Sequence, residues 1–321
     1  MDIFLQQIIN GLVLGSIYAL IALGYTMVYG VLGLINFAHG DVLMIGALAA
    51  YSAMSALSGV APGLPGWVLL TAGLLTAIPV CMAVSFSIER IAYRPLRNAP
   101  RLAPLITAIG VSITLQTLAM IIWGRSYLIF PSTLPVEPVD LITFPPSAGI
   151  DYVRTVSITP IQILIVSVSM LLMIALTLII NKTRIGKAMR ATAESPAIAS
   201  LMGINPNTVI AATFMIGGGL AGVAGVMVAA NYSVAHFYMG FIPGLKAFTA
   251  AVVGGIGNIY GAMLGGLLLG LVESLGGGYL GQLTGGVFGS NYQDIFAFAV
   301  LILVLTLRPS GLLGEKVSDR A

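Results

Sequence analysis

The sequence predicts an all-α polytopic membrane protein with about nine transmembrane or broken-helix spans. Of its 321 residues, 58% are hydrophobic and 8% are charged, whereas about a quarter of the residues of a soluble globular protein carry a charge. Five long stretches contain no charged residue: 42–88, 102–124, 155–181, 195–235 and 247–272. Each can cross the apolar core of a bilayer, which takes about 17–25 residues of α-helix, so membrane lipid is expected to surround the chain.

The uncharged stretches, and the glycines and prolines that interrupt them, place each expected helix. We expect spans near residues 8–30, 37–57, 67–88, 104–123, 159–180, 207–230 and 290–307. In the remaining apolar segment, 241–280, four glycines interrupt the pattern: Gly254, Gly255, Gly257 and Gly261. Because glycine weakens the interior of a helix, this segment is predicted to form two short legs with a break at Gly257 and Asn258.

The basic residues orient these spans. They form two clusters in the predicted inner loops 89–103 and 181–206: Arg90, Arg94, Arg97 and Arg101, and then Lys182, Arg184, Lys187 and Arg190. Because Lys and Arg near helix ends favour the cytoplasm, nine spans place the N-terminus outside and the C-terminus, with Arg308, Lys316 and Arg320, inside. Three bases are then expected outside: Arg125, Arg154 and Lys246. Eight spans would place the C-terminal bases outside as well, so nine are preferred.

The longest polar connection is the predicted outer loop 124–158. It contains five prolines and three acidic residues: Pro131, Pro135, Pro138, Pro145, Pro146, Glu137, Asp140 and Asp151. This composition predicts a covering or docking segment without regular structure. No polar segment is long enough to enclose a core of its own, so residues 1–321 are expected to form a single transmembrane domain. The basic clusters are explained by membrane orientation, and no nucleic-acid partner is expected.

Polar residues and glycines collect at the junction of the first two spans, between Gly30 and Asp41. Backbone that leaves the helix at membrane depth survives only where protein buries it or water lines it, and such breaks mark pathways in transporters. Asn36, His39 and Asp41 are therefore candidates for residues that line or shape a translocation pathway. Gly254, Gly255 and Gly257, at the second break, are candidates for the same reason.

Each ionisable group of the first junction also has a structural interpretation. Asp41 can serve as the N-cap of a helix that begins at Val42. His39 can be a hydrogen-bonded structural histidine at a helix interface. A proton relay through both is disfavoured because no chain of further carboxylates continues it.

The inner loop 181–206 predicts one short helix at the inner membrane surface. Pro196 fits a helix start, Gly203 fits a helix stop, and Pro206 cannot extend the helix. Ile198, Leu201 and Met202 fall on one helical face. This helix is interpreted either as an ordinary interfacial helix or as a docking helix for a cytoplasmic partner.

The remaining motifs do not predict catalysis. The segment from Asn181 to Ala188 lacks the first glycine and the Ser or Thr of a phosphate-binding loop, so ATP, if it is used, is expected on another chain. The glycines from Gly217 to Gly222 fit a dinucleotide motif but lie in an apolar span. One cysteine, Cys81, and two histidines give no metal site and no nucleophile–base pair. We expect no catalytic residue, no metal and no cofactor in this chain.

Three further expectations concern packing within the membrane. Cys81 is expected to be a small buried apolar residue, and Glu273 is expected at the membrane interface. Glycine pairs four residues apart are expected to let helices approach closely; they are Gly11 and Gly15, Gly218 and Gly222, Gly257 and Gly261, Gly261 and Gly265, and Gly266 and Gly270.

Five ordered segments carry a family likeness: Gly15–Gly30, Ile35–Gly40, Ile88–Pro95, Leu201–Asn205 and Met239–Ala262. With them, from about residue 6 to 314, the chain resembles the LivH-type permease subunit of bacterial ABC importers for branched-chain amino acids. The resemblance implies the ABC importer permease fold and leucine, isoleucine or valine as cargo. Relatives of similar sequence handle urea or short-chain amides, which is the alternative within the family. A channel or carrier that works without ATP, using His39 and Asp41, is the alternative outside it.

The resemblance also implies partners in the bacterial inner membrane. They are a second permease subunit, two cytoplasmic ATP-binding subunits that hold ATP and magnesium, and a periplasmic amino-acid-binding protein. In this family the ATPase docks on the inner loop, so the resemblance implies docking residues among Arg190, Glu194, Ala197, Leu201 and Gly203.

Overall fold

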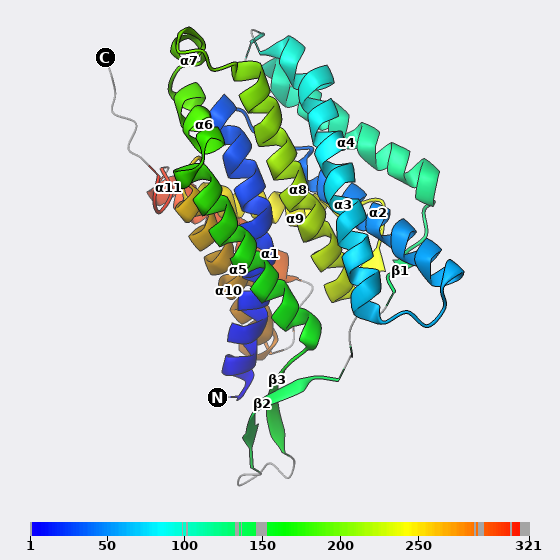
Figure 1. Cartoon of the computed structure of the whole chain (residues 1–321). Coiled ribbons are helices and arrows are strands. Elements are labelled where there is room, and N and C mark those ends of the chain that lie inside the picture. The colour runs from blue at the N-terminus through cyan, green and yellow to red at the C-terminus, as the bar shows by residue number, and fades with distance from the viewer. Residues whose placement is uncertain are drawn as a thin grey trace.

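The computed structural model describes residues 2–97, 99–100, 102–131, 135, 137–145, 153–285, 287, 292–308 and 310–314. These residues form an elongated bundle of helices, with a small hairpin at the end where the chain begins (Figure 1). The helices are α1 (Asp2–Leu32), α2 (His39–Val60), α3 (Gly66–Ser87), α4 (Leu102–Trp123), α5 (Pro160–Lys182), α6 (Arg184–Glu194), α7 (Pro196–Leu201), α8 (Pro206–Tyr232), α9 (Phe241–Gly254), α10 (Ile259–Leu283) and α11 (Gln293–Leu307). A π-helical turn, η1 (Ile88–Tyr93), and a 3₁₀ turn, η2 (Arg94–Leu96), follow α3.

Seven of the described helices are long and apolar enough to cross a membrane: α1, α2, α3 with its extension to Leu96, α4, α5, α8 and α10. Two shorter apolar helices, α9 with 14 residues and α11 with 15, bring the number of apolar helical segments in the described chain to nine. The all-α fold class and the prediction of about nine spans are confirmed. At a rise of 1.5 Å per residue, α9 is about 21 Å long, shorter than the roughly 30 Å apolar core of a bilayer.

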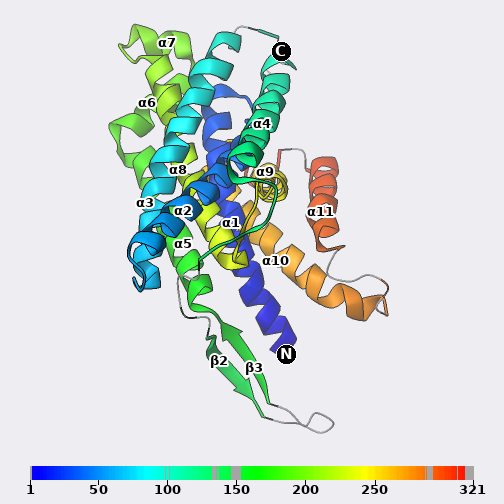
Figure 2. The same ribbon diagram turned by 90° about the vertical axis from the view of Figure 1, so that its right-hand side faces the viewer.

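The position of α9 explains why this short helix is stable. In Figure 2, α9 is seen nearly along its axis while α1 runs lengthwise through the bundle, so α9 crosses the direction of α1. It packs against α1, α2, α10 and α11. Its polar backbone ends are thus covered by protein and not by lipid, which is the condition for ending a helix at membrane depth.

Helix α1 is the centre of the core, and α10 is its main antiparallel neighbour. Small residues make this contact close, because a Cβ atom on Gly15 would lie only 2.8 Å from the Cα of Leu267. Gly270 likewise lies against the backbone of Gly15, and Gly266 lies against Ala19. Without a hydrophobic drive in lipid, such close approach is what holds membrane helices together. The prediction that the glycine pairs pack helices is confirmed at these positions.

The break in the segment 241–280 is also confirmed, although its two legs differ from the prediction. Helix α9 ends at Gly254, and α10 begins at Ile259. Gly255 and Gly257 adopt positive φ angles of 108° and 94° between the helices, a conformation that favours glycine. The second leg was expected to be short, but α10 has 25 residues, because glycines facing α1 stabilise packing more than they weaken the helix.

The prediction that loop 124–158 lacks regular structure is wrong. Strands β2 (Val139–Phe144) and β3 (Arg154–Ile158) pair antiparallel, and a short strand β1 (Leu128–Ile129) pairs with β4 (Val234–Ala235). The side chain of Gln6 on α1 binds the backbone of Ser157 through two hydrogen bonds of 3.0 Å. The hairpin is thereby joined to the start of α1. Pro146 and Asp151 lie outside the described residues.

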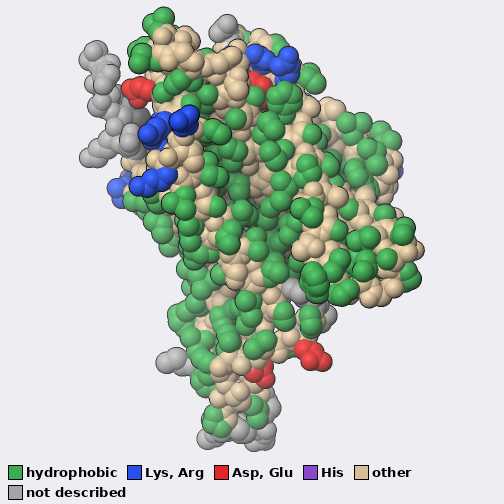
Figure 3. All heavy atoms as spheres, in the orientation of Figure 1, with side chains coloured by type: hydrophobic (Ala, Val, Ile, Leu, Met, Phe, Trp, Pro, Cys, Tyr) green, Lys and Arg blue, Asp and Glu red, His purple; other side chains and the backbone are tan. Residues whose placement is uncertain are grey.

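Lys and Arg side chains gather at the opposite end of the molecule, around α6 and α7 (Figure 3). The connection from α3 to α4, which carries the first basic cluster, lies at this same end (Figure 1). The structure therefore places both predicted inner loops at one end and the start of α1 with the hairpin at the other end. Arg101, Lys316 and Arg320 lie outside the described residues. We call the two ends the basic end and the hairpin end.

Candidate functional site

The chain turns back into the bundle after α1, and α2 begins well inside it. His39, the first residue of α2, packs against Gly24 of α1, where a Cβ atom would collide with the imidazole. Gly24 lies eight residues before Leu32, the end of α1, which corresponds to about 12 Å along the helix. Segment 33–38 is thus non-helical backbone at depth, in agreement with the expectation of a broken helix at this junction.

Asn36 organises this turn through its side chain. Its Oδ1 accepts a hydrogen bond from the backbone N–H of Ala38 at 3.2 Å and another from the hydroxyl of Tyr93 at 3.2 Å. The backbone N–H of His39 donates to the carbonyl of Asn36 at 3.0 Å. Asn36 and Tyr93 are both buried. Asn36 therefore fixes the start of α2 to the π-helical turn η1, a role that sequence reasoning did not assign to it.

His39 and Asp41 point to different helices. The ring of His39 packs edge-on against Tyr25 with the ring centroids 4.8 Å apart. Asp41 accepts a hydrogen bond of 2.9 Å from Gln116 of α4. Residues two apart on a helix do not face each other, so these two side chains form no relay.

The interpretation of Asp41 as an N-cap is wrong, because α2 begins at His39 and the carboxylate of Asp41 is directed to α4. The interpretation of His39 as an interface residue fits its place between Gly24 and Gly217, two glycines that make room for its ring. Its Nε2 atom has no hydrogen-bond partner among the described residues.

A cavity of about 180 Å³ lies where α2 and α9 begin. A Cβ atom on Gly40 of α2 would lie 2.5 Å from the carbonyl oxygen of Gly240, so the starts of these two helices are in backbone contact. The cavity is lined by residues from α1, α2, α4 and α9, including Tyr25, Asp41, Ser112, Phe241 and Leu245. Of the six pathway candidates, Asp41 alone lies in this lining as the described residues show it. We call this space the deep cavity.

Gly254, Gly255 and Gly257 pack closely against backbone at the α9–α10 break. Gly254 abuts Gly261, and Gly255 abuts Gly314. The backbone N–H groups of Leu312 and Leu313 donate to the carbonyls of Val253 and Gly254 at 2.8 and 2.9 Å. The residues after α11 thus close the break. The prediction that these glycines lie on the pathway stays a prediction.

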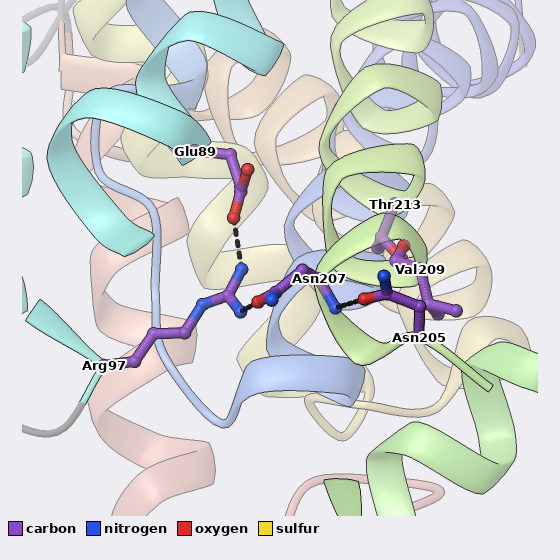
Figure 4. Close-up of polar contacts among 6 residues, drawn as sticks. All are labelled: Glu89, Arg97, Asn205, Asn207, Val209 and Thr213. Atoms are coloured by element: carbon purple, nitrogen blue, oxygen red, sulfur yellow. Dashed lines mark hydrogen bonds and ion pairs between the residues drawn. The ribbon is translucent and has the colours of Figure 1, made fainter. Parts of the chain in front are cut away.

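At the basic end, a polar clamp joins the first inner loop to the start of α8 (Figure 4). Arg97 forms an ion pair with Glu89 of η1 and donates a hydrogen bond of 2.5 Å to the side chain of Asn207 on α8. Glu89 is only 1% exposed, so its charge depends on Arg97 for compensation. Asn205 caps α8 through a 3.0 Å bond to the N–H of Asn207. We call Glu89, Arg97 and Asn207 the inner clamp.

Sequence reasoning saw the basic residues of the inner clamp only as an orientation signal. Eight residues separate Glu89 from Arg97, and 110 separate Arg97 from Asn207, so no helical spacing connects them. The signal that could have found the site is the single acidic residue, Glu89, beside a basic cluster at the end of a long uncharged stretch.

The inner loop 181–206 contains two helices, whereas one was predicted. Helix α6 is capped by Thr183, whose hydroxyl accepts from the N–H of Gly186 at 3.2 Å. Helix α7 starts at Pro196 with Ser195 as its cap, and Gly203 has a φ of 81°, as expected for a helix stop. The additional helix is α6, which tolerates its basic residues because Arg184, Lys187 and Arg190 are exposed on its surface.

All five docking candidates lie on the exposed surface of this helical pair: Arg190, Glu194, Ala197, Leu201 and Gly203. The apolar side chains of Ile198, Leu201 and Met202 also point away from the protein, and Leu201 is 85% exposed. Ala199 on the other face is buried. An apolar face at this end of the molecule is therefore uncovered by the described chain.

Two ionisable residues lie elsewhere than expected. Lys246, predicted in an outer connection, is buried on α9, and Glu273, predicted at the interface, is buried on α10. They form an ion pair of 2.6 Å. Each residue alone resembles an interfacial charge, and only the packing of α9 on α10 shows that the two compensate each other. Cys81 is buried and free, as predicted.

Comparison with known proteins places the chain among transport proteins. A sequence model of the family described as "Branched-chain amino acid transport system / permease component" matches residues 7–305. The chain is 48% identical, over 97% of its length and 96% of the relative, to the high-affinity branched-chain amino acid transport system permease protein LivH of Escherichia coli K12. It is equally similar, with the same coverage, to the BraD permease protein of Pseudomonas aeruginosa. A probable LivH of Methanocaldococcus jannaschii is 29% identical over 98% of the chain.

Proposed function

Because the chain belongs to the family of branched-chain amino acid transport system permease components, we propose that it is the membrane-spanning permease subunit of an ATP-driven importer in a bacterial inner membrane. Its cargo is leucine, isoleucine or valine. The observation that carries this proposal is the 48% identity to a curated permease along 97% of the chain. The matched length includes the broken helices and the inner loops, which are the parts that a transport subunit needs.

The proposed importer contains a second permease chain, two cytoplasmic ATP-binding subunits and a periplasmic amino-acid-binding protein. ATP and magnesium reside on the ATP-binding subunits. The basic end faces the cytoplasm, in keeping with the enrichment of Lys and Arg on that side of membrane proteins. The N-terminus and the hairpin then face the periplasm, and the C-terminus faces the cytoplasm.

The ATP-binding subunits dock on α6 and α7. Their shared surface combines charged residues, Arg190 and Glu194, with the exposed apolar residues Leu201 and Met202. Apolar side chains surrounded by charge are typical of protein interfaces. The same helices are continuous with α8 through Asn205, so force on α7 reaches the N-terminus of α8.

The inner clamp offers a route from the docking site to the deep cavity. Asn207 on α8 contacts Arg97, Arg97 pairs with Glu89 on η1, and Tyr93 on η1 holds Asn36 before α2. The backbone of η1 joins the two sets of contacts, since Glu89 and Tyr93 both lie on this turn. Movement of α8 relative to α3 displaces the start of α2, which lines the deep cavity. Alternating access then follows from rearrangement of the broken helices α2 and α9.

An ATP-independent carrier based on His39 and Asp41 is the weaker alternative, because these side chains contact different helices. Urea or a short-chain amide remains the alternative cargo within the family. A transport assay that offers both kinds of solute separates these possibilities.

The test is to purify the tagged chain from its native membrane in mild detergent and to identify its companions. Recovery of an ATPase and a second, similar permease supports the proposal. The complex is then placed in liposomes with its binding protein, and uptake of leucine, urea and acetamide is measured with and without ATP. ATP-dependent leucine uptake is the expected result. A chain recovered alone that carries solute on an ion gradient would overturn the proposal.

A further inference from the structure

An ionic trio with two buried members and one partly exposed member joins α9, α10 and α11. The Nζ atom of Lys246 lies 2.6 Å from Oε1 of Glu273 and 2.6 Å from Oδ1 of Asp294. The hydroxyl of Tyr18 on α1 lies 3.3 Å from the same Nζ atom and donates to Glu273 at 3.2 Å. Lys246 and Glu273 are 4% and 1% exposed. The ammonium group thus has three oxygen neighbours, which is as many hydrogen bonds as it can donate.

The charges of this trio do not balance. One ammonium faces two carboxylates, which leaves a formal charge of −1 beside the buried Lys246–Glu273 pair. The second carboxylate oxygen of Glu273 is buried and has no hydrogen-bond partner among the described residues. Charged side chains inside a membrane bundle usually pair with one another, and one carboxylate is enough for one lysine. The second carboxylate, that of Asp294, is partly exposed and can bind a further positive group.

The trio borders a cavity of about 440 Å³ on the side of the hairpin end, which we call the outer cavity. Its volume lies within the roughly 300–1,000 Å³ usual for small-molecule sites. Lys246 and Asp294 are in its wall, and the side chain of Asp294 is 42% exposed. The remaining wall includes apolar side chains, such as Ile17, Val228 and Ile242, and polar groups of Tyr232 and Gln293.

We propose that the outer cavity binds the amino acid itself, with its α-ammonium group on Asp294. This inference rests on the proposed function, and it names the binding site. The substrate is a zwitterion and adds no net charge, but its ammonium group lies on the carboxylate that Lys246 compensates only in part. The phenol of Tyr232 and the amide of Gln293 supply hydrogen-bond donors for the substrate carboxylate, and the apolar wall receives the branched side chain.

The position of α9 is consistent with a transport role for such a site. Ile242 and Pro243 face the outer cavity, while Phe241, Gly244 and Leu245 line the deep cavity. The first turn of α9 is therefore the partition between the two spaces. Substrate held at Asp294 lies on the hairpin side of this partition, and displacement of that turn opens the way to the deep cavity.

The test uses photo-leucine, a leucine analogue with a diazirine in its side chain, on the purified importer complex in nanodiscs without the binding protein. After illumination, labelled residues are mapped by mass spectrometry. We expect labels on α8 and α9 around Val228 and Ile242. Excess leucine should remove the labels, whereas 4-methylpentanoate, which has the same apolar chain but no ammonium group, should leave them.

The variant is D294N, which keeps the size of the side chain and the Lys246–Glu273 pair. It should lower labelling about tenfold or more, as expected for the loss of a charged hydrogen bond. The control is D140N, the same change on an exposed hairpin residue, which should label like the unaltered protein. Elution of all three complexes as one peak in size-exclusion chromatography verifies folding.

Three results would overturn the proposal: no label at these residues in the unaltered complex, equal labelling of D294N, or competition by 4-methylpentanoate as strong as by leucine. The proposed function is judged separately by ATP-dependent uptake. A complex that imports leucine but fails the labelling test refutes this binding site alone, whereas a complex without uptake refutes the proposed function.

Discussion

The hydroxyl of Tyr93 donates a hydrogen bond to the side-chain oxygen of Asn36 at 3.2 Å, and this contact ties the π-helical turn after α3 to the broken start of α2. Tyr93 also packs on Phe214 of α8 with ring centroids 5.4 Å apart. One side chain of the inner loop thus touches both α8 and the turn that precedes α2. π-helical turns are rare and often occur at functional sites, which agrees with a role of η1 in coupling.

Replacing Tyr93 with phenylalanine removes this hydrogen bond and keeps the ring packing. We expect a loss of about 1 kcal/mol in stability and a lower ratio of leucine imported to ATP hydrolysed. The measurement is parallel uptake and phosphate release in liposomes. Y260F is the matched control, because the hydroxyl of Tyr260 contacts only the exposed side chain of Asn181 among the hydrogen bonds described for it. An unchanged ratio in Y93F would refute the coupling role of Tyr93.

The inner clamp predicts a specific pattern of rescue. R97M leaves Glu89 buried without its cation, which should cost about 3–5 kcal/mol and lower the thermal midpoint of the complex. The double variant E89Q/R97M removes both charges and should be more stable than R97M. The measurement is thermal unfolding of the purified complex in detergent. If the double variant is less stable than R97M, Arg97 acts through something other than compensation of Glu89.

Much of the fold could be predicted because a short stretch of sequence indicates each of these features. Uncharged stretches give the spans, Gly255 and Gly257 give the break, and Pro196 and Gly203 give the ends of α7. The hairpin could not be predicted as readily, because the prolines of this loop favour irregular structure and the β-branched residues of β2 and β3 do not alternate along the strands.

The functional contacts could not be predicted in this way. Lys246 meets Glu273 across 27 residues and Arg97 meets Asn207 across 110, and nothing in the spacing of either pair indicates contact. A local rule predicts Asp41 as an N-cap, but the hydrogen bond of its side chain to Gln116 on α4 decides its orientation. In a bundle, charges are paired by helix packing, which short sequence patterns do not contain.

The exposed apolar face of α7 makes a prediction about assembly. L201E puts a charge at a side chain that is 85% exposed, so the chain itself should fold and insert normally. Recovery of the ATP-binding subunit with the tagged chain should fall about tenfold, as at a central interface residue. The control is L141E, a similar change at an exposed leucine of the hairpin. Equal recovery of the ATPase with both variants would contradict docking at α7.

A substitution at Gly203 tests whether α7 transmits movement to α8. It does not test whether the ATP-binding subunit is recovered with the chain. The φ of 81° at Gly203 is unfavourable for any residue with a branched Cβ, so G203V should distort the link between α7 and α8 at a cost of about 1–2 kcal/mol. We expect the complex to assemble and hydrolyse ATP while leucine uptake is largely lost. The checks are uptake and ATPase activity of the same preparation. Normal ATP-driven uptake in G203V would refute the assignment of this loop as the coupling element.

Substitutions at and away from the contact between α1 and α10 distinguish the effect of helix packing on folding from the effect of helix propensity. Gly270 lies against the backbone of Gly15, so a side chain at residue 270 has no space, whereas a Cβ atom at Gly110 of α4 would meet nothing within 4 Å. G270L and G110L make the same chemical change in apolar helices. G270L should lower the yield of folded protein in size-exclusion chromatography, since overpacking costs about 1–3 kcal/mol or more, and G110L should not lower it. Equal yields would mean that α10 shifts freely along α1, and the close approach of these two helices would then not be what holds the centre of the bundle.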